Sequence, residues 1–296
     1  MRYLLFILFF YPVFCFALEK KIYSPYLTPG KLTVLVTFDG SKDLKKWSNI
    51  LEFSKQENIK CTFFVSGVYF LSQDQRHVYQ YPKDPHQTGV SDIGFGGSPL
   101  QVQDRRLFLQ RVIQEGHAIE SHLNGHFEAY RWTGPMWESE CHQFSTFLSF
   151  TKPCMAIRFP LLQHNKEVYP ILKKYGYKAI VSAIMPSYTH FYLQEGILIF
   201  PISTINGILN MDYNFYLIDL KKKRRGIEAK NHMVNAYLKE AERCFKEKRP
   251  FFINHHFSAW NKEAYFEALK EAVILIKKKY PTEFLTVPEL IQKVRE

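Results

Sequence analysis

The alternation of short apolar segments with amphipathic helical segments constrains the fold of this chain more than any other feature. Residues 32 to 39 form the clearest apolar segment, and they lack the period of two that marks a strand with one face in water. Such a strand is buried on both faces, as in a parallel sheet covered by helices. Behind it, Leu44, Trp47 and Leu51 have the three-to-four spacing of a helix. This order predicts a strand–helix unit of an α/β fold.

The same alternation continues to the end of the chain. Further strands are expected at residues 59–66, 117–122, 155–159, 178–184, 197–203, 251–256 and 284–287, and helices near 101–115, 136–149, 166–175, 228–247 and 262–279. Parallel strands need crossover connections, which these helices supply. We therefore predict an α/β fold, a single distorted (β/α) barrel with about seven parallel strands.

The first 17 residues have the pattern of a secretory signal peptide. Arg2 precedes an apolar run over residues 4–16, and Ala17 ends a small-x-small cleavage site. The run is too short for a comfortable membrane span. We expect cleavage near Ala17, a single catalytic domain over residues 18–296 without a stable transmembrane anchor, and a secreted or periplasmic location.

A formal net charge of +11 bears on the partners of the chain. Basic runs lie at residues 221–225 and 277–279. Nucleic acid is a poor partner for a secreted protein, and we expect none. An anionic envelope polymer or membrane surface fits the charge, although a basic run is more often a solvated face.

Four cysteines follow the predicted signal peptide, an even number in an oxidising compartment. Cys141 and Cys154 are close in sequence, and a bridge between them would stabilise the fold by about 3 kcal/mol in the chain-entropy treatment. Cys61 lies in an apolar run, where a buried free thiol is expected. None of the four, with Cys244 included, has metal-ligand spacing.

Polar residues stand at the ends of the predicted strands. Asp39, His122, Arg158 and His255 fall at or just past the carboxyl ends of four of them. Because these ends converge on one face of an α/β barrel, the four residues can meet in one cleft. His126 follows His122 by four residues, and the two imidazoles can share a metal ion if a short helical turn follows the strand.

Taken in order, these motifs resemble the polysaccharide deacetylases of carbohydrate esterase family 4. That family shows a Thr-Phe-Asp-Asp strand end, a His-Ser/Thr-x-x-His motif, an Arg-x-Pro motif and a late Leu-x-His motif. The corresponding segments here are Thr37-Phe38-Asp39, His122-Leu-Asn-Gly-His126, Arg158-Phe-Pro160 and Ile253-Asn-His255. The resemblance covers residues 32 to 290 and implies a barrel that hydrolyses the amide of an N-acetylated sugar.

The resemblance also implies roles for these residues. A divalent metal, with zinc the expected ion, would be held by His122 and His126 together with Asp39. Asp39 would act as general base, and Arg158 would pair with it to keep it ionised and aimed. His255 would deliver a proton to the leaving nitrogen.

Two neighbouring histidines compete for the role of the acid. His255 and His256 are adjacent on a predicted strand, so their side chains point to opposite faces and only one can act in the cleft. The register of the Leu-x-His motif favours His255. His256 is then expected to contact the substrate.

Further residues are candidates for substrate binding. The backbone N–H near Leu161 is expected, by the resemblance, to help hold the oxyanion. Asp212, Tyr213 and Asn214 would line the sugar site or buttress His255, although a turn with a packed tyrosine explains them equally well. Trp260 could stack on a pyranose ring.

The chain departs from the family pattern at Gly40, where the family carries a second aspartate that ligates the metal. Catalytic zinc normally has three protein ligands and a water. Either Asp39 joins the metal, another acid such as Asp43 or Asp92 replaces the missing one, or water completes a weak site. The remaining alternative is that no metal binds.

The sequence therefore predicts a metal-dependent N-deacetylase acting on an extracytoplasmic glycan. Peptidoglycan is the preferred substrate because a basic exported protein would meet that acidic polymer first, while chitooligosaccharide and exopolysaccharide remain open. The alternative, motivated by Gly40, is a weakly active or inactive glycan-binding protein on the same fold.

Overall fold

The computed structural model describes residues 28–40, 42–184, 191–257, 261 and 263–295. The expected signal peptide, its cleavage site and Trp260 lie outside the described residues. Within these ranges, no helix is both long and apolar enough to cross a membrane.

Most of the elements occur where the sequence predicts them. The strands are β1 (Leu32–Asp39), β2 (Cys61–Val65), β3 (Gln80–Tyr81), β4 (Asp84–Thr88), β5 (Ala118–Ser121), β6 (Ala156–Ile157), β7 (Ala179–Ile184), β8 (Tyr192–Gln194), β9 (Ile197–Ile202), β10 (Thr204–Ile205), β11 (Ile208–Leu209), β12 (Phe251–His256) and β13 (Thr282–Phe284). The helices are α1 (Leu44–Glu57), α2 (Pro99–Gln114), α3 (Gly134–Phe147), α4 (Val168–Lys174), α5 (Asp212–Lys221), α6 (Ile227–Glu247), α7 (Ala264–Lys279) and α8 (Val287–Arg295). Short 3₁₀ turns lie at Gly67–Phe70, Arg76–Val78 and Pro160–Leu162.

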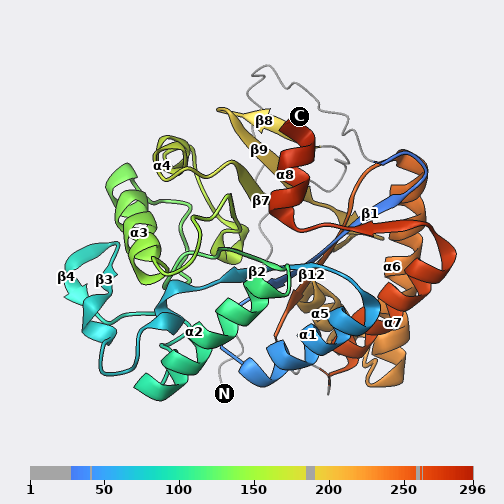
Figure 1. Cartoon of the computed structure of the whole chain (residues 1–296), viewed down its shortest axis with the longest axis horizontal. Helices are drawn as coiled ribbons and strands as arrows, with labels where there is room; N and C mark the ends of the chain where they lie inside the picture. Colours follow the sequence, from blue (N-terminus) through green and yellow to red (C-terminus); the bar gives the residue numbers. More distant parts are fainter. Residues whose placement is uncertain (1–27, 41, 185–190, 258–260, 262, 296) are drawn as a thin grey trace.

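A curled, mostly parallel sheet organises these elements. Its strand order is β12-β1-β2-β5-β6-β7-β9-β8, and β13 also pairs with β1. Every neighbouring pair in this sheet is parallel except β8 with β9. Helices α1, α2, α3, α6 and α7 surround the sheet (Figure 1). The predicted α/β barrel is confirmed as a half-barrel of this kind.

The side chains of β1 show why the strand lacks a polar face. Val34, Val36 and Phe38 point outward into the apolar cluster that the surrounding helices share. Leu35 points inward into a second apolar cluster, which fills the interior of the sheet. Both faces of β1 are therefore buried, as its continuous apolar sequence predicts.

Helix α8 closes the half-barrel at the amino ends of its strands. Val287, Leu290 and Ile291 pack inside the sheet against the inward cluster, and the backbone N of Val287 donates to Thr62 Oγ1 on β2 at 2.9 Å. Figure 1 shows α8 beside β7 and β9. The opposite end, where the strands have their carboxyl termini, stays open for a cleft.

One local prediction is wrong, and the structure decides two points that the sequence left open. The strand expected at 284–287 ends at Phe284, and α8 begins where it should have continued. Asp212 to Asn214 open helix α5 and do not form a turn. Cys141 and Cys154 are free thiols: Cys141 is buried on α3, and Cys154 Sγ lies 3.6 Å from the carbonyl oxygen of Ile119.

Candidate active site

A cleft of about 520 Å³ lies at the carboxyl ends of the strands. Asp39 ends β1, His122 follows β5, and His256 ends β12, so three separate strands deliver them to the same place. The residues that line the cleft are Asp39, Gly40, Lys42, Asp43, Ser66, Tyr69, Ile93, His122, His126, His256 and Phe257. The predicted convergence of polar strand ends is therefore what the structure shows for Asp39 and His122, whereas His256 stands in the cleft where His255 was expected.

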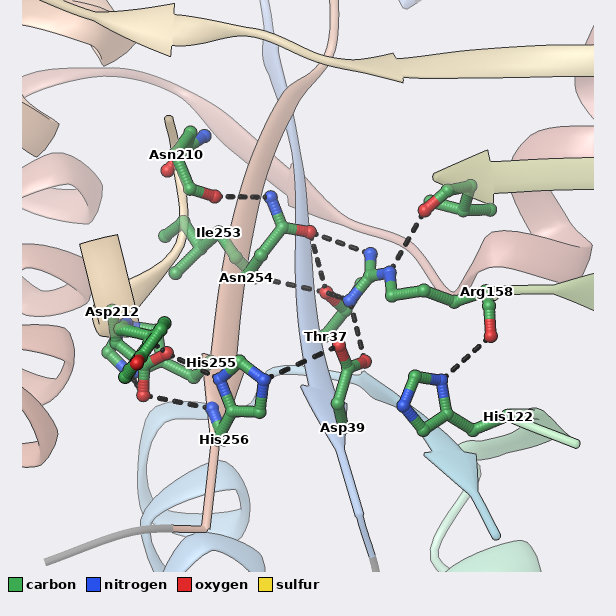
Figure 2. Close-up of polar contacts among 12 residues, drawn as sticks. Thr37, Asp39, His122, Arg158, Asn210, Asp212, Ile253, Asn254, His255 and His256 are labelled. Atoms are coloured by element: carbon green, nitrogen blue, oxygen red, sulfur yellow. Dashed lines mark hydrogen bonds and ion pairs between the residues drawn. The ribbon is translucent and has the colours of Figure 1, made fainter. Parts of the chain in front are cut away.

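A buried ion pair forms the base of this cleft (Figure 2). Arg158 Nη1 donates to Asp39 Oδ1 at 2.8 Å, and the two side chains are 0% and 2% exposed. The guanidinium also donates to Thr37 Oγ1 at 2.9 Å, Asn254 Oδ1 at 2.7 Å and the carbonyl oxygen of Val181 at 2.9 Å. The pairing of Arg158 with Asp39 is thus as predicted, and it is one part of a larger network.

The charges of this network determine whether the Asp39 carboxyl is protonated. Burial by itself would raise the pKa of the Asp39 carboxyl. The positive charge of Arg158 is the largest influence that opposes burial, and the net pKa of Asp39 lies below the ordinary value. Asp39 is therefore ionised at neutral pH, and its second oxygen is directed toward His256, whose Nε2 is 3.9 Å away.

His122 presents a free lone pair to the cleft. Its Nδ1 lies 2.7 Å from the carbonyl oxygen of Arg158 (Figure 2). A carbonyl oxygen only accepts, so Nδ1 carries the hydrogen and Nε2 keeps the lone pair. Burial lowers the pKa of His122 to about 4, so the ring is neutral at pH 7. A neutral imidazole whose other nitrogen donates to a backbone carbonyl is typical of a metal ligand.

His126 reaches the same cleft by a different route from the predicted helical turn. Leu123 and His126 both have left-handed backbone angles, with φ of 55° and 64°, and the segment between the two histidines is not helical. This bent loop brings the His122 and His126 rings to a centroid separation of 5.3 Å in an edge-on arrangement. The histidine pair is confirmed, but the helical turn is wrong.

A buried carboxylate from α3 holds this loop. Glu140 Oε1 accepts hydrogen bonds from the backbone N of Asn124 at 2.9 Å and of Gly125 at 3.2 Å. Tyr79 donates its hydroxyl to Oε2 at 2.7 Å. The loop conformation that carries His126 is therefore fixed by side chains from outside the loop.

The residues present do not complete a three-ligand metal site. Within the described part of the chain, no group of three His, Cys, Asp or Glu side chains is placed to hold an ion. His122 and His126 supply two imidazoles, whereas Asp39 is engaged by Arg158. Of the two alternative acids, Asp43 lines the cleft but accepts the backbone N of Lys46 as the cap of α1. The expected zinc set of His122, His126 and Asp39 is not assembled.

The structure places His256 in the cleft and His255 outside it. The His256 Nδ1 is 2.7 Å from Asp212 Oδ1, and its backbone N donates to Asp212 Oδ2 at 2.9 Å. His255 points to the other face of β12, where its Nε2 is 2.9 Å from the Tyr237 hydroxyl on α6. Burial lowers the pKa of His255 to about 4, so the ring is neutral at pH 7 and is not the imidazolium that a general acid requires. The choice of His255 as the acid is therefore wrong for this geometry.

Asp212 shifts the protonation of His256. Burial would lower the pKa of His256, but the Asp212 carboxylate outweighs burial and the pKa lies above the ordinary value. Asp212 was expected to buttress His255, but the structure pairs it with His256 instead. His255 Nδ1 lies 3.7 Å from Asp212 Oδ2, a longer contact.

Three other candidates lie apart from the cleft wall. Leu161, with φ of 53°, is half exposed in the turn after β6. Tyr213 is exposed and Asn214 half-buried in the first turn of α5. None of the three is among the residues that line the cleft. Their contacts with substrate stay predictions.

Sequence reasoning missed several residues of the site. Thr37 and Asn254 hold Arg158, Ser66 lines the cleft, and Glu140 holds the histidine loop. Alternation along β12 was the available signal, because Asn254 shares a strand face with His256 while His255 lies on the other.

Comparison with known proteins identifies the family of the chain. The family model for polysaccharide deacetylase matches residues 27–180, more than half of the chain. The chain belongs to the polysaccharide deacetylase family. The resemblance to carbohydrate esterase family 4 is thereby confirmed. No protein of curated function matches the sequence.

Solved structures share the fold of this polysaccharide deacetylase homologue at low sequence identity. A protein described as a polysaccharide deacetylase from Mycobacterium smegmatis has a TM-score of 0.66 at 14% identity, over 94% of this chain and 95% of that one. A carbohydrate esterase family 4 pseudoenzyme from Bacillus anthracis has a TM-score of 0.51 at 14% identity, over 90% and 67%. The Bc1960 peptidoglycan N-acetylglucosamine deacetylase has a TM-score of 0.51 at 14% identity, over 88% and 89%.

Removing the buried positive charge of Arg158 should destabilise the fold strongly. We expect Arg158→Met to lower the free energy of unfolding by about 3–5 kcal/mol, because Asp39 is left as an uncompensated buried charge. Adding Asp39→Asn should recover part of that loss. Chemical denaturation of the two single variants and the double variant measures the coupling.

The control is Arg111→Met, which breaks an exposed pair with Glu115 on α2. That change should cost less than about 1 kcal/mol. Equal losses for Arg111→Met and Arg158→Met, or strictly additive losses for Arg158→Met and Asp39→Asn, would contradict a tightly coupled buried pair.

Proposed function

We propose that this member of the polysaccharide deacetylase family removes N-acetyl groups from an extracytoplasmic glycan by amide hydrolysis. The observation that carries the proposal is the placement of Asp39 and His256 side by side in one cleft, at the ends of the neighbouring strands β1 and β12. Arg158 keeps the first as a carboxylate, and Asp212 raises the pKa of the second and so favours its protonated form. Two titratable groups whose environments push their pKa values apart are the arrangement that acid–base catalysis requires.

Asp39 is assigned as the general base. Its lowered pKa keeps it ionised, and one oxygen is fixed by Arg158 while the other faces the cleft. In this position the carboxylate takes a proton from the water that attacks the acetyl carbonyl carbon. Proton transfer by a positioned group contributes typically about 10²- to 10⁴-fold to the rate.

His256 is assigned as the general acid. Its Nδ1 donates to Asp212, so its Nε2 is the nitrogen that faces Asp39 and the cleft. A raised pKa keeps Nε2 protonated to higher pH, and this proton passes to the nitrogen of the leaving amine. The acetyl group leaves as acetate, and the sugar keeps a free amine.

Deacetylases of this family are metal-dependent, and the histidine pair bears on that property. We propose that His122 and His126 provide the two protein ligands of a divalent ion, with zinc the expected choice. Since Gly40 contributes no carboxylate and Asp39 is bound to Arg158, affinity should be weak.

Peptidoglycan is the proposed substrate. The formal charge of +11 favours an acidic polymer, and a structural neighbour is a peptidoglycan N-acetylglucosamine deacetylase. Chitooligosaccharide and exopolysaccharide carry the same reacting group. The proposed secreted or periplasmic location would bring the chain to such polymers.

A glycan-binding protein without catalysis is the second candidate. Gly40 and the incomplete ligand set favour it, and a pseudoenzyme of the same fold exists in Bacillus anthracis. This candidate predicts binding to glycan without acetate release.

Acetate release separates the two candidates. Purified full-length chain with peptidoglycan and zinc should release acetate, and Asp39→Asn should lower kcat by about 10²-fold or more because the base is lost. Asp84→Asn, at an exposed position on β4, is the matched control and should be fully active. Glycan binding by the wild type without any acetate release would establish the binding protein instead.

Restoring a carboxylate at position 40 should strengthen metal binding. Gly40 lines the cleft, and a Cβ placed on it meets no atom within 4 Å. Its φ of 84° is left-handed, a region that aspartate tolerates better than most residues. We expect Gly40→Asp to bind Zn²⁺ at least about tenfold more tightly, which corresponds to about 1.4 kcal/mol, by isothermal titration calorimetry.

Gly207→Asp is the matched control, because Gly207 also has positive φ and open space but lies in the β10–β11 hairpin. It should leave zinc affinity unchanged. An unaltered affinity in Gly40→Asp would mean that another group already fills the third position.

A further inference from the structure

One hydroxyl in the wall of the cleft is buried without a hydrogen-bond partner. Ser66 directly follows β2 and lines the cleft, and its side chain is 0% exposed. Among the described residues, nothing donates to or accepts from its Oγ. Buried hydroxyls are normally paired, so an unpaired one at a cleft points to a missing ligand.

The position of Ser66 is fixed by the two strands on either side of β2. Phe64 pairs with Asp39 on β1, and the Val65 carbonyl oxygen accepts the backbone N of His122 at 2.9 Å. Ser66 faces the inner side of the sheet, as Phe64 does, because alternate residues of a strand share a face. The hydroxyl therefore lies on the sheet between the elements that carry Asp39 and His122.

Other buried serines of the chain differ from Ser66 in having partners. Ser182 Oγ accepts the backbone N of Phe159 at 3.3 Å, and Ser121 Oγ accepts that of Leu123 at 3.2 Å. Ser54 Oγ lies 3.4 Å from Cys61 Sγ. An unpaired buried hydroxyl carries an uncompensated desolvation cost, which a ligand that supplies the partner removes.

We propose that Ser66 is a substrate-binding residue that donates its hydroxyl hydrogen to the carbonyl oxygen of the substrate's acetamide group. The proposal rests on the proposed function and deepens it, because it names the part of the sugar that is recognised. A neutral hydroxyl can donate to a carbonyl, and a free amine offers no such acceptor oxygen. Ser66 would thus distinguish an N-acetylated sugar from its deacetylated product.

The test compares Ser66→Ala with Ser54→Ala, a matched buried serine on α1, in the full-length chain. Ser66→Ala should unfold at a urea concentration no lower than the wild type, because no bond within the protein is lost. Its kcat/KM for acetate release should fall at least about tenfold. Ser54→Ala should show the opposite pattern, with a lower unfolding midpoint and unchanged kcat/KM.

Binding of tetra-N-acetylchitotetraose and of the glucosamine tetramer gives a readout that does not need turnover. Ser66→Ala should weaken binding of the acetylated tetramer at least about tenfold and leave the affinity for the glucosamine tetramer unchanged. If the wild type binds the acetylated tetramer but releases no acetate, the proposed function fails, while this selective loss still supports Ser66.

Three results would overturn the assignment of Ser66 and leave the proposed function standing if acetate is released. These are an unchanged kcat/KM in Ser66→Ala, an equal effect of the substitution on both tetramers, and a loss of stability like that of Ser54→Ala. Absence of any binding of the acetylated tetramer by the wild type would overturn it as well.

Discussion

The buried ion pair between Arg158 and Asp39 is the interaction on which the rest of the site depends. Two charges at 0% and 2% exposure are costly unless every polar atom near them is satisfied. Arg158 meets this condition through Thr37 on β1, Asn254 on β12 and the Val181 carbonyl on β7. One guanidinium thus connects strands from both halves of the sheet while it orients the Asp39 carboxylate, the proposed general base.

The interior of the half-barrel is divided into two layers that meet at this pair. Below it lie apolar side chains of the sheet and of α8, with the Phe64 ring 4.4 Å from the guanidinium carbon of Arg158. Above it lies the cleft with its histidines. The apolar layer excludes water beneath Arg158, and the low dielectric strengthens the interaction that holds Asp39 ionised. Folding and proposed catalysis therefore rest on the same contacts.

The sequence was sufficient for the framework and for part of the site. Apolar strands with both faces buried located β1, β2 and β12, and polar residues at their ends predicted the cleft. Helix α5 was not predicted because Asp212 to Asn214 lie in an apolar neighbourhood without clear helical periodicity. The start of α8 was missed because its first residue, Val287, was assigned to the strand expected at 284–287. Such short elements are decided by tertiary packing.

The errors within the site have equally specific causes. A motif register selected His255, whereas the pleat of β12 turns His256 toward Asp39 and His255 toward Tyr237. The left-handed residues of the histidine loop depend on Glu140, which is distant in sequence and reaches the loop only in the folded chain. A missing hydrogen-bond partner, as at Ser66, is visible only in three dimensions.

The most direct test of the central claim is the pH dependence of kcat/KM for acetate release in the wild type and in Asp212→Asn. If His256 is the acid, activity falls as pH rises through its pKa, which the Asp212 carboxylate holds above the ordinary value. Removing that charge lowers the pKa, so the falling limb should move to lower pH in the variant. A limb that stays at the same pH would contradict the assignment of His256 and, with it, the proposed division of labour between Asp39 and His256.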